Sequence, residues 1–143
     1  MKKYVILFLA IFSLCSCNWD KEEFNDVIVK LNNETDYTLV ISNIDNGGDS
    51  RFYPESSITL NPYDTYSQTL KRISSNEPIN IAPVSMTIEY NGQSINLNSE
   101  MDIKRNPCRA EDWIRYSNFS KFGSGVFFAF DIRKEDLENW VSR

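Results

Sequence analysis

Histidine is absent from the 143 residues of this chain. Ser-His-Asp and Cys-His catalysis both need an imidazole as general base, and many zinc sites use imidazole as a ligand. The sequence therefore excludes these kinds of catalysis and any His-ligated metal. We expect a non-catalytic protein with no metal and no cofactor.

A long apolar run is also missing. The apolar stretch Tyr4–Leu14, interrupted only by Ser13, has about eleven residues, and a membrane-spanning helix needs about 18–20. The stretch follows the positively charged Met1-Lys2-Lys3. A short apolar run behind positive charge is typical of a signal peptide.

The apolar stretch ends in Leu14-Cys15-Ser16-Cys17. This tetrapeptide resembles the lipobox of bacterial lipoproteins, in which a leucine and two small residues precede the cysteine, with Cys15 as a departure at the second position. The resemblance implies that residues 1–16 are removed as a lipoprotein signal peptide. It also implies that Cys17 carries diacylglycerol and further acylation at its new amino terminus, such as palmitate. Two or more acyl chains anchor a protein stably, so the membrane is an expected partner; an ordinary secretory signal is the alternative.

Cysteine and positive charge are scarce in the rest of the chain. Without residues 1–16, which hold two lysines and no acid, the chain has 13 basic and 20 acidic residues, a net charge of −7. Such a balance argues against nucleic acid and against electrostatic binding to anionic lipid heads. Cys108 is the only cysteine left beside Cys17, so we expect no disulfide within the chain and a buried structural role for Cys108. A guanidinium near Cys108, such as that of Arg109, would lower its pKa.

The stretch that follows Cys17 is charged and has no hydrophobic periodicity. We interpret residues 17–26 as an acidic tether and residues 27–143 as a single domain. Lys21-Glu22-Glu23 resembles the signal that sends Bacteroidetes lipoproteins to the outer face of the outer membrane, and the whole layout resembles small lipoproteins of gut Bacteroidetes. The resemblance implies an outer-membrane protein that is exposed on the surface. A solvated linker on a periplasm-facing protein is the alternative.

Alternating apolar residues predict β-strands through much of the domain. In Val27–Leu31 and Tyr37–Ser42 every second residue is apolar, and turn-forming residues lie between them. This arrangement predicts a hairpin or meander. Met86–Leu97 predicts a second hairpin around Asn91-Gly92, a pair that favours a type I′ turn. The register of this second hairpin would place Met86 opposite Leu97, Ile88 opposite Ile95 and Tyr90 opposite Gln93.

The remaining segments predict shorter elements and the fold class. We expect an edge strand at 51–53, a strand at 58–60, a loop at 71–83, a short helix at 110–116 with Trp113 buried, a turn at 123–125, a central strand at 126–132 and a helical turn or two at 134–140. Short strands separated by turns are typical of sandwiches and small barrels. The sequence therefore predicts an all-β antiparallel sandwich of about seven strands with an immunoglobulin-like layout.

Aromatic side chains are the main candidates for ligand contact. Tyr63 and Tyr66 lie beside Pro62 in an expected loop, where aromatic rings are hard to explain as core, so we predict that they face a ligand. Flat rings bind the C–H faces of sugars. Other aromatic candidates are Tyr53, Trp113, Tyr116 and Trp140.

Two further groups supply carboxylates. Glu100, Asp102, Glu111 and Asp112 lie near one another in sequence, and a pair of acids across a cleft would allow glycoside hydrolysis. Asp45, Asn46 and Asp49 offer oxygens that suit Ca²⁺ but do not follow the EF-hand spacing, so an Asn-Gly-rich turn is the expected structure there.

These features favour a lipid-anchored, non-catalytic envelope protein that acts as a binding or accessory module for a protein or glycan. The alternatives are a structural or assembly lipoprotein facing the periplasm, and a small carboxylate-dependent hydrolase.

Overall fold

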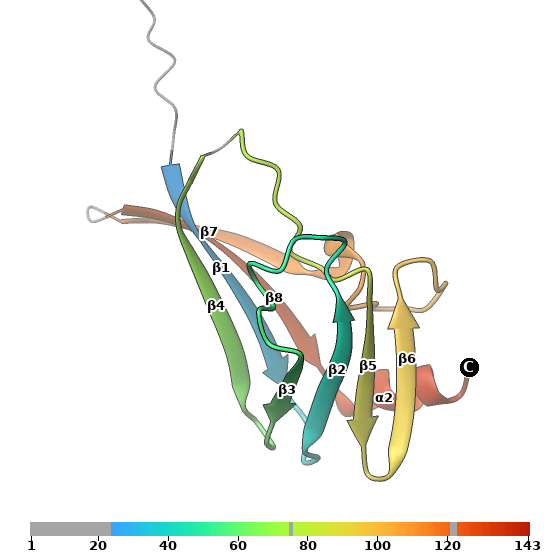
Figure 1. Ribbon diagram of the computed structural model, residues 1–143. Coiled ribbons are helices and arrows are strands. Elements are labelled where there is room, and N and C mark those ends of the chain that lie inside the picture. Colours follow the sequence, from blue (N-terminus) through green and yellow to red (C-terminus); the bar gives the residue numbers. More distant parts are fainter. Residues whose placement is uncertain (1–23, 75, 121–122) are drawn as a thin grey trace, which may run out of the picture.

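Two four-stranded β-sheets packed face to face make up the fold (Figure 1). The structure is a computed structural model that describes residues 24–74, 76–120 and 123–143. Sheet A has the strand order β4-β1-β8-β7, and sheet B has the order β3-β2-β5-β6. The described strands are β1 (Phe24–Asn33), β2 (Leu39–Asp45), β3 (Ser57–Leu60), β4 (Thr65–Ser74), β5 (Ser85–Tyr90), β6 (Gln93–Asn98), β7 (Ile114–Ser120) and β8 (Gly123–Ile132). The predicted all-β sandwich is confirmed, with eight strands in the described part of the chain.

The strand order brings the two ends of the domain together in sheet A. β1 runs parallel to β8, and the other described pairings are antiparallel. In an immunoglobulin constant-type sandwich the first, second, fifth and fourth strands share one sheet. Here the first strand instead lies between the fourth and the eighth, so the strand order differs from that layout.

The core lies between the sheets and follows the predicted alternation. Val27, Val29 and Leu31 of β1 are all buried, and so are Leu39 and Ile41 of β2. Residues of the same parity in β8 also point inward: Phe130 and Ile132 are buried and Phe128 packs half-buried against them. Ten-residue strands extend sheet A beyond the shorter strands of sheet B, as Figure 1 shows.

The predicted hairpin at residues 86–97 is confirmed in its register. β5 pairs with β6 so that Met86 faces Leu97, Ile88 faces Ile95 and Tyr90 faces Gln93. The two turn residues have positive φ, 47° at Asn91 and 73° at Gly92. A type I′ turn requires positive φ at both positions, which explains this residue pair.

The predicted hairpin between residues 27–31 and 37–42 is wrong. β1 belongs to sheet A and β2 to sheet B, and the chain between them crosses from one sheet to the other. The buried side chain of Asn33 holds this crossing, because its amide donates to the carbonyls of Tyr37, Leu60 and Asn61 and its oxygen accepts from Thr35. The alternation correctly identified the inward face but not the strand partner.

The predicted edge strand at residues 51–53 is also wrong. This segment is a bend whose two aromatic side chains enter the core. The Tyr53 hydroxyl donates to the Ile81 carbonyl at 2.9 Å, and the Phe52 carbonyl accepts from the Tyr66 hydroxyl at 2.7 Å. Two adjacent buried rings cannot both point inward from a strand, so the segment folds irregularly.

Three other boundaries differ from the predictions. β4 continues to Ser74, into the range expected to be a loop, and Gly123–Gly125 is the start of β8 and not a turn. The expected helix at 110–116 is reduced to a single 3₁₀ turn, Ala110–Asp112, before β7 begins at Ile114. Trp113 between them is buried, as predicted.

The expected C-terminal helical turns are present as α2, Lys134–Val141. Leu137 and Trp140 are buried against the core, and Trp140 contacts the Phe130 ring. The backbone N–H of Arg133 donates to the Asp136 carboxylate, which also pairs with Arg105 at 3.0 Å. Burial raises the pKa of Asp136. Among the described helices none is long and apolar enough to cross a membrane.

At the other end of the domain, β1 begins at Phe24, three residues before the expected boundary at 27, and the lipobox and most of the expected tether lie outside the described residues.

Candidate functional site

The outward face of sheet A carries apolar side chains on three neighbouring strands. Because Val27, Val29 and Leu31 point inward, Ile28 and Lys30 of β1 point outward. The strand register places Phe127 of β8 beside Ile28, and Tyr116 of β7 beside Phe127. The next row contains Lys30, Ala129 and Ile114. We call Ile28, Lys30, Ile114, Tyr116 and Phe127 the outer strip.

The aromatic pair forms the centre of the outer strip. The Tyr116 and Phe127 rings stack with their centroids 5.9 Å apart and their planes 21° apart. The Lys30 ammonium lies 5.8 Å from the centroid of the Phe127 ring, within the range of a cation–π contact. Ile114 is 50% exposed and Tyr116 is 47% exposed. Solvent therefore reaches an apolar surface that the sandwich core does not use.

Polar side chains lie next to the outer strip on the same face. The Asn32 amide donates to the Asp131 carboxylate at 2.7 Å and accepts from the Thr65 hydroxyl at 2.9 Å. The Arg133 guanidinium lies 4.0 Å from Asp131 and donates to Glu34 at 3.2 Å. We call Asn32, Thr65 and Asp131 the polar row. With Lys30, this face offers donors and acceptors beside the stacked rings.

The two tyrosines predicted to face a ligand have different environments. Tyr63 is 73% exposed and has φ of 63° in the turn before β4, so its ring extends into solvent. Tyr66 is half-buried: its ring stacks on Tyr53 at 6.0 Å, and its hydroxyl is bonded to the Phe52 carbonyl. Burial raises the pKa of Tyr66. Tyr66 therefore holds the 51–53 bend in place. The rings of Tyr63 and Tyr66 do not form one shared binding surface.

Cys108 has a structural environment, and Cys17 lies outside the described residues. The Cys108 thiol is buried and free, and burial raises its pKa to about 12. The expectation that a guanidinium lowers the pKa of Cys108 is wrong, because the Arg109 guanidinium donates to Asp112 and to the Ile103 carbonyl. A thiol that stays protonated at neutral pH is a poor nucleophile.

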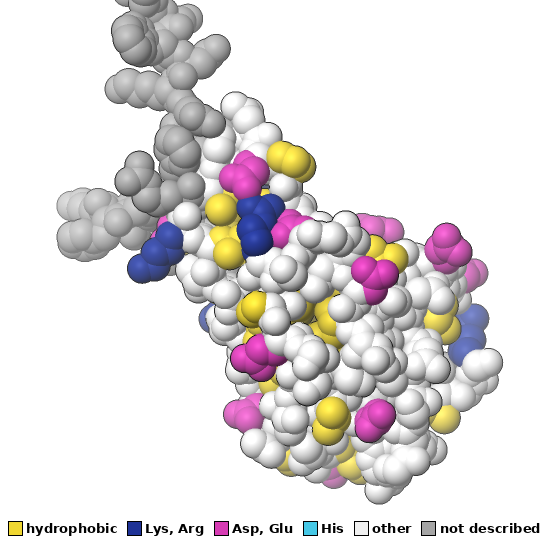
Figure 2. Space-filling view, viewed as in Figure 1, with side chains coloured by type: hydrophobic (Ala, Val, Ile, Leu, Met, Phe, Trp, Pro, Cys, Tyr) yellow, Lys and Arg dark blue, Asp and Glu magenta, His cyan; other side chains and the backbone are white. Residues whose placement is uncertain are grey.

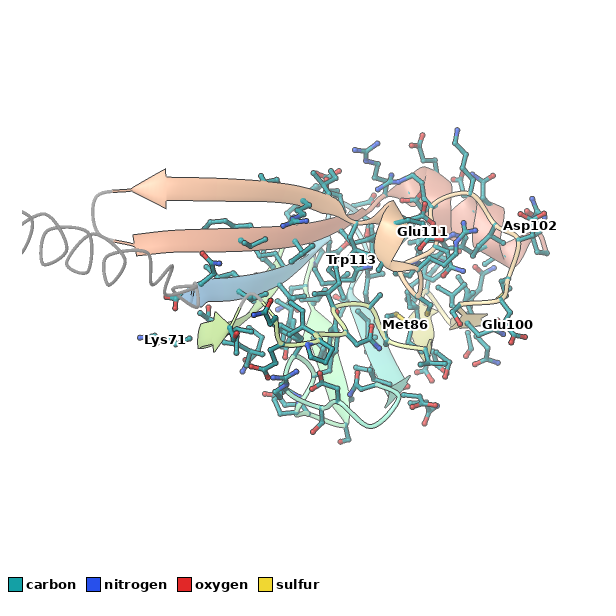
Figure 3. The ribbon with its side chains drawn as sticks, turned by 90° about the horizontal axis from the view of Figure 1, so that it is seen from above. Lys71, Met86, Glu100, Asp102, Glu111 and Trp113 are labelled. Atoms are coloured by element: carbon teal, nitrogen blue, oxygen red, sulfur yellow. The ribbon has the colours of Figure 1, made fainter. Side chains whose placement is uncertain are left out.

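The carboxylates considered for hydrolysis do not converge. Figure 3 shows Glu100, Asp102 and Glu111 at separate points of the loop between β6 and β7, and all three are exposed. Asp112 instead accepts from the Asn106 backbone N–H at 2.8 Å and pairs with Arg109. The structure thus places none of the four opposite another across a cleft.

The two carboxylates considered for Ca²⁺ are used within their own loop. Asp49 accepts from the Arg51 guanidinium, which holds the pKa of Asp49 at about 2, and Asp45 accepts from the Gly47 backbone N–H. Across the described residues no three acidic, cysteine or histidine side chains are placed to share a metal ion.

One apolar groove lies at the end of sheet A where β1 begins. It has a volume of about 270 Å³, and its lining includes Val27, Ile73, Ile79 and Phe128. Arg115 lies at the groove with its guanidinium 5.8 Å from the Phe128 ring centroid. Glu77 and Ile79, from the segment that leads into β5, also line the groove. In the upper part of Figure 2, apolar side chains lie beside dark blue and magenta ones.

Sequence reasoning included Tyr116 among several aromatics but missed Phe127, Ile28 and Ile114. The available signal was the unbroken apolar run Val126–Phe130, in which residues of both parities are apolar. Such a run places apolar side chains on both faces of a strand. The class defined by this fold and surface is an all-β sandwich with one apolar outer face. No protein-family model, no curated protein and no solved structure matches the chain.

Proposed function

We propose that this chain is a non-catalytic binding module of the bacterial cell envelope, attached to the outer membrane by lipid at Cys17. The observation that carries the binding role is the outer strip, an exposed aromatic and aliphatic surface that the core does not need. Contiguous exposed apolar surface on a small domain commonly marks a contact site. The partner class is a protein or glycan at or outside the outer membrane.

The attachment rests on the sequence around Cys17. Six residues, 18–23, separate the lipidated cysteine from the first residue of β1. At about 3.5 Å for each residue, the end of sheet A where β1 begins lies within roughly 25 Å of the anchoring point. A short connection of this kind keeps the domain close to the membrane on which it acts.

Fractionation of cells that express the full chain tests the anchor. We expect the wild type in the membrane fraction and the Cys17→Ser variant in the soluble fraction, because the variant has no thiol to carry the lipid. Cys108→Ser is the matched control, since it removes the other cysteine that lies after residue 16 and should leave the chain in the membrane. Retention of Cys17→Ser in membranes would contradict lipid attachment at this residue.

Protease treatment of intact cells tests the location. We expect digestion, because the surface position implied by Lys21-Glu22-Glu23 leaves the domain outside the outer membrane. Full protection until the outer membrane is opened would favour the periplasm-facing structural lipoprotein instead.

Capture from solubilised membranes tests the recognition role. Material retained by the wild type should be lost from Tyr116→Ala and kept by Tyr63→Ala, which removes an exposed ring outside the outer strip. Equal retention by all three proteins would remove the outer strip from the proposal.

A further inference from the structure

We infer that the outer strip takes an extended, uncharged polysaccharide chain; this rests on the proposed binding role of the same surface. The rings of Tyr116 and Phe127 stack beside the ammonium of Lys30, and the polar row lies on the same sheet face.

The rings supply the apolar contact that a sugar needs. An aromatic ring has a negative face, and the C–H groups on one side of a sugar ring carry partial positive charge, so the two surfaces attract while both lose water. Tyr116 keeps 47% of its surface exposed despite stacking on Phe127. Ile114, half exposed beside it, enlarges the same apolar surface.

Hydrogen-bonding groups around the rings match sugar hydroxyls, which both donate and accept. Lys30 brings an ammonium with three donors over the Phe127 ring. Asn32 and Asp131 add amide and carboxylate groups two residue pairs beyond Lys30 and Ala129 along the same strands. A surface of this composition satisfies the hydroxyls that a purely apolar surface would leave without partners.

The charge of this face favours an uncharged chain. Lys30 and Arg133 are positive, Asp131 and Glu34 are negative, and Arg133 contacts both acids. The four charges sum to zero, so the face has no excess of positive charge to attract an acidic polymer.

The shape of the strip favours a polymer over a protein partner. The row Tyr116–Phe127–Ile28–Thr69 crosses all four strands of sheet A, which spans about 14 Å at the usual strand spacing. A stable protein interface buries about 800 Å² on each side, whereas two half-exposed side chains and their neighbours offer only a narrow apolar band. An extended sugar chain lying along this row needs no deep pocket.

Binding of the full chain, purified from membranes in detergent, to a panel of polysaccharides tests the inference. The panel contains uncharged glucans, xylans, mannans and galactans, with polygalacturonate and alginate as acidic members. We expect at least one uncharged polymer to bind and Tyr116→Ala to weaken its Kd about tenfold, equivalent to about 1.4 kcal/mol. Tyr63→Ala, the matched control, should change the Kd by less than about twofold. Lys30→Met should weaken binding by a smaller factor, because it keeps the apolar stem and removes the donors.

The dependence on salt separates the ligand classes. Binding of an uncharged chain should be nearly the same at low and high salt, because screening acts only on charge. Binding only of the acidic polymers, with steep loss at high salt, would overturn the inference. An unchanged Kd in both Tyr116→Ala and Ile114→Ser would also overturn the inference. Ile114→Ser changes a second exposed residue of the outer strip, so the test still works if Tyr116→Ala does not fold.

A blank panel also overturns the inference, and the membrane-capture experiment then decides the fate of the proposed function. If capture still depends on Tyr116, the outer strip binds something other than a polysaccharide and the binding role stands. If neither experiment depends on Tyr116, both proposals fail.

Discussion

The outward faces of the two sheets differ, although both inward faces contribute buried apolar side chains to the core. On sheet B, two rows of four outward residues run across the strands: Thr59, Val40, Glu89 and Ser94, then Ser57, Ser42, Thr87 and Asn96. On sheet A the equivalent rows are Thr69, Ile28, Phe127 and Tyr116, then Ser67, Lys30, Ala129 and Ile114. One of eight outward residues is apolar on sheet B, and five of eight are apolar on sheet A. Figure 2, which shows the sheet B side, has scattered charged and apolar side chains there.

This contrast separates what the fold needs from what it does not. A sheet with one solvated face is stable with polar residues outward, as sheet B demonstrates. The apolar residues on the outward face of sheet A are therefore in excess of what a two-layer sandwich requires. Contact with a partner explains such an excess, and for this reason the comparison between the faces supports the proposed site.

The largest expected effect comes from two phenylalanines of opposite parity on β8. Phe130 points inward, is 1% exposed, and contacts Trp113 and Trp140, whereas Phe127 points outward. Phe130→Ala should lower the free energy of unfolding by about 3–5 kcal/mol, because it leaves a cavity in the core. Phe127→Ala should cost only about 1 kcal/mol, the worth of an aromatic pair. Urea denaturation of both variants checks this, and equal losses would mean that the outer strip is part of the core.

The next effect concerns the crossing between the sheets. Asn33→Ala leaves the carbonyls of Tyr37, Leu60 and Asn61 without their amide donor. Buried polar groups without partners cost about 1–3 kcal/mol, so we expect a loss of about 2–3 kcal/mol in the free energy of unfolding. Asn32→Ala is the control: this neighbour points outward, bonds Asp131 and should cost less than about 1 kcal/mol. Equal losses would show that the crossing does not depend on the Asn33 amide.

Local patterns in the sequence predicted local structure correctly. The 86–97 hairpin was predicted in register because its turn residues and its alternation lie within twelve residues of one another. The alternation of β1 likewise gave its inward face. The alternation could not identify the neighbouring strands of β1, because β1 pairs with β4 and β8, which lie far along the chain. A two-residue alternation indicates which side chains share a face, but it does not indicate which strand is the hydrogen-bonded neighbour.

The candidate site depends on this missing information. Tyr116 and Phe127 are eleven residues apart, and only the pairing of β7 with β8 brings their rings together. Tyr66 shows the opposite case: it was expected to face a ligand because its neighbourhood resembled a loop. The inward fold of the 51–53 bend supplies Tyr53 and Phe52 as its partners, and no local pattern indicates that bend.

Alkaline pH should weaken the domain through Cys108. The pKa of this thiol is about 12 in the folded chain and near 9 when unfolded. Between these values the unfolded chain releases the proton and the folded chain keeps it, so the free energy of unfolding falls as the pH rises, by on the order of 2 kcal/mol at about pH 11. Well below pH 9 the thiol is protonated in both states and contributes no such change. Denaturation across this range checks the slope.

Cys108→Ala is the control for that slope. It removes the thiol, so its stability should fall less steeply with pH than that of the wild type. Part of the fall should remain, because burial also raises the pKa of Tyr53. An identical slope in both proteins would exclude Cys108 as its source.

The smallest effect compares one glycine in each sheet. Gly92 has φ of 73° in the sheet B hairpin, and a Cβ added there would meet only open space, so only backbone strain opposes a side chain. Gly92→Ala should therefore cost about 1 kcal/mol. Gly125 lies within β8 of sheet A, and a Cβ there would meet Phe127 at 3.4 Å, an ordinary contact. Gly125→Ala should leave stability unchanged or raise it by roughly 0.5 kcal/mol, because glycine loses more conformational freedom on folding. Thermal unfolding measures both. A loss in Gly125→Ala as large as that in Gly92→Ala would mean that the Phe127 ring cannot shift, and that the outer strip is held more rigidly than an open binding surface requires.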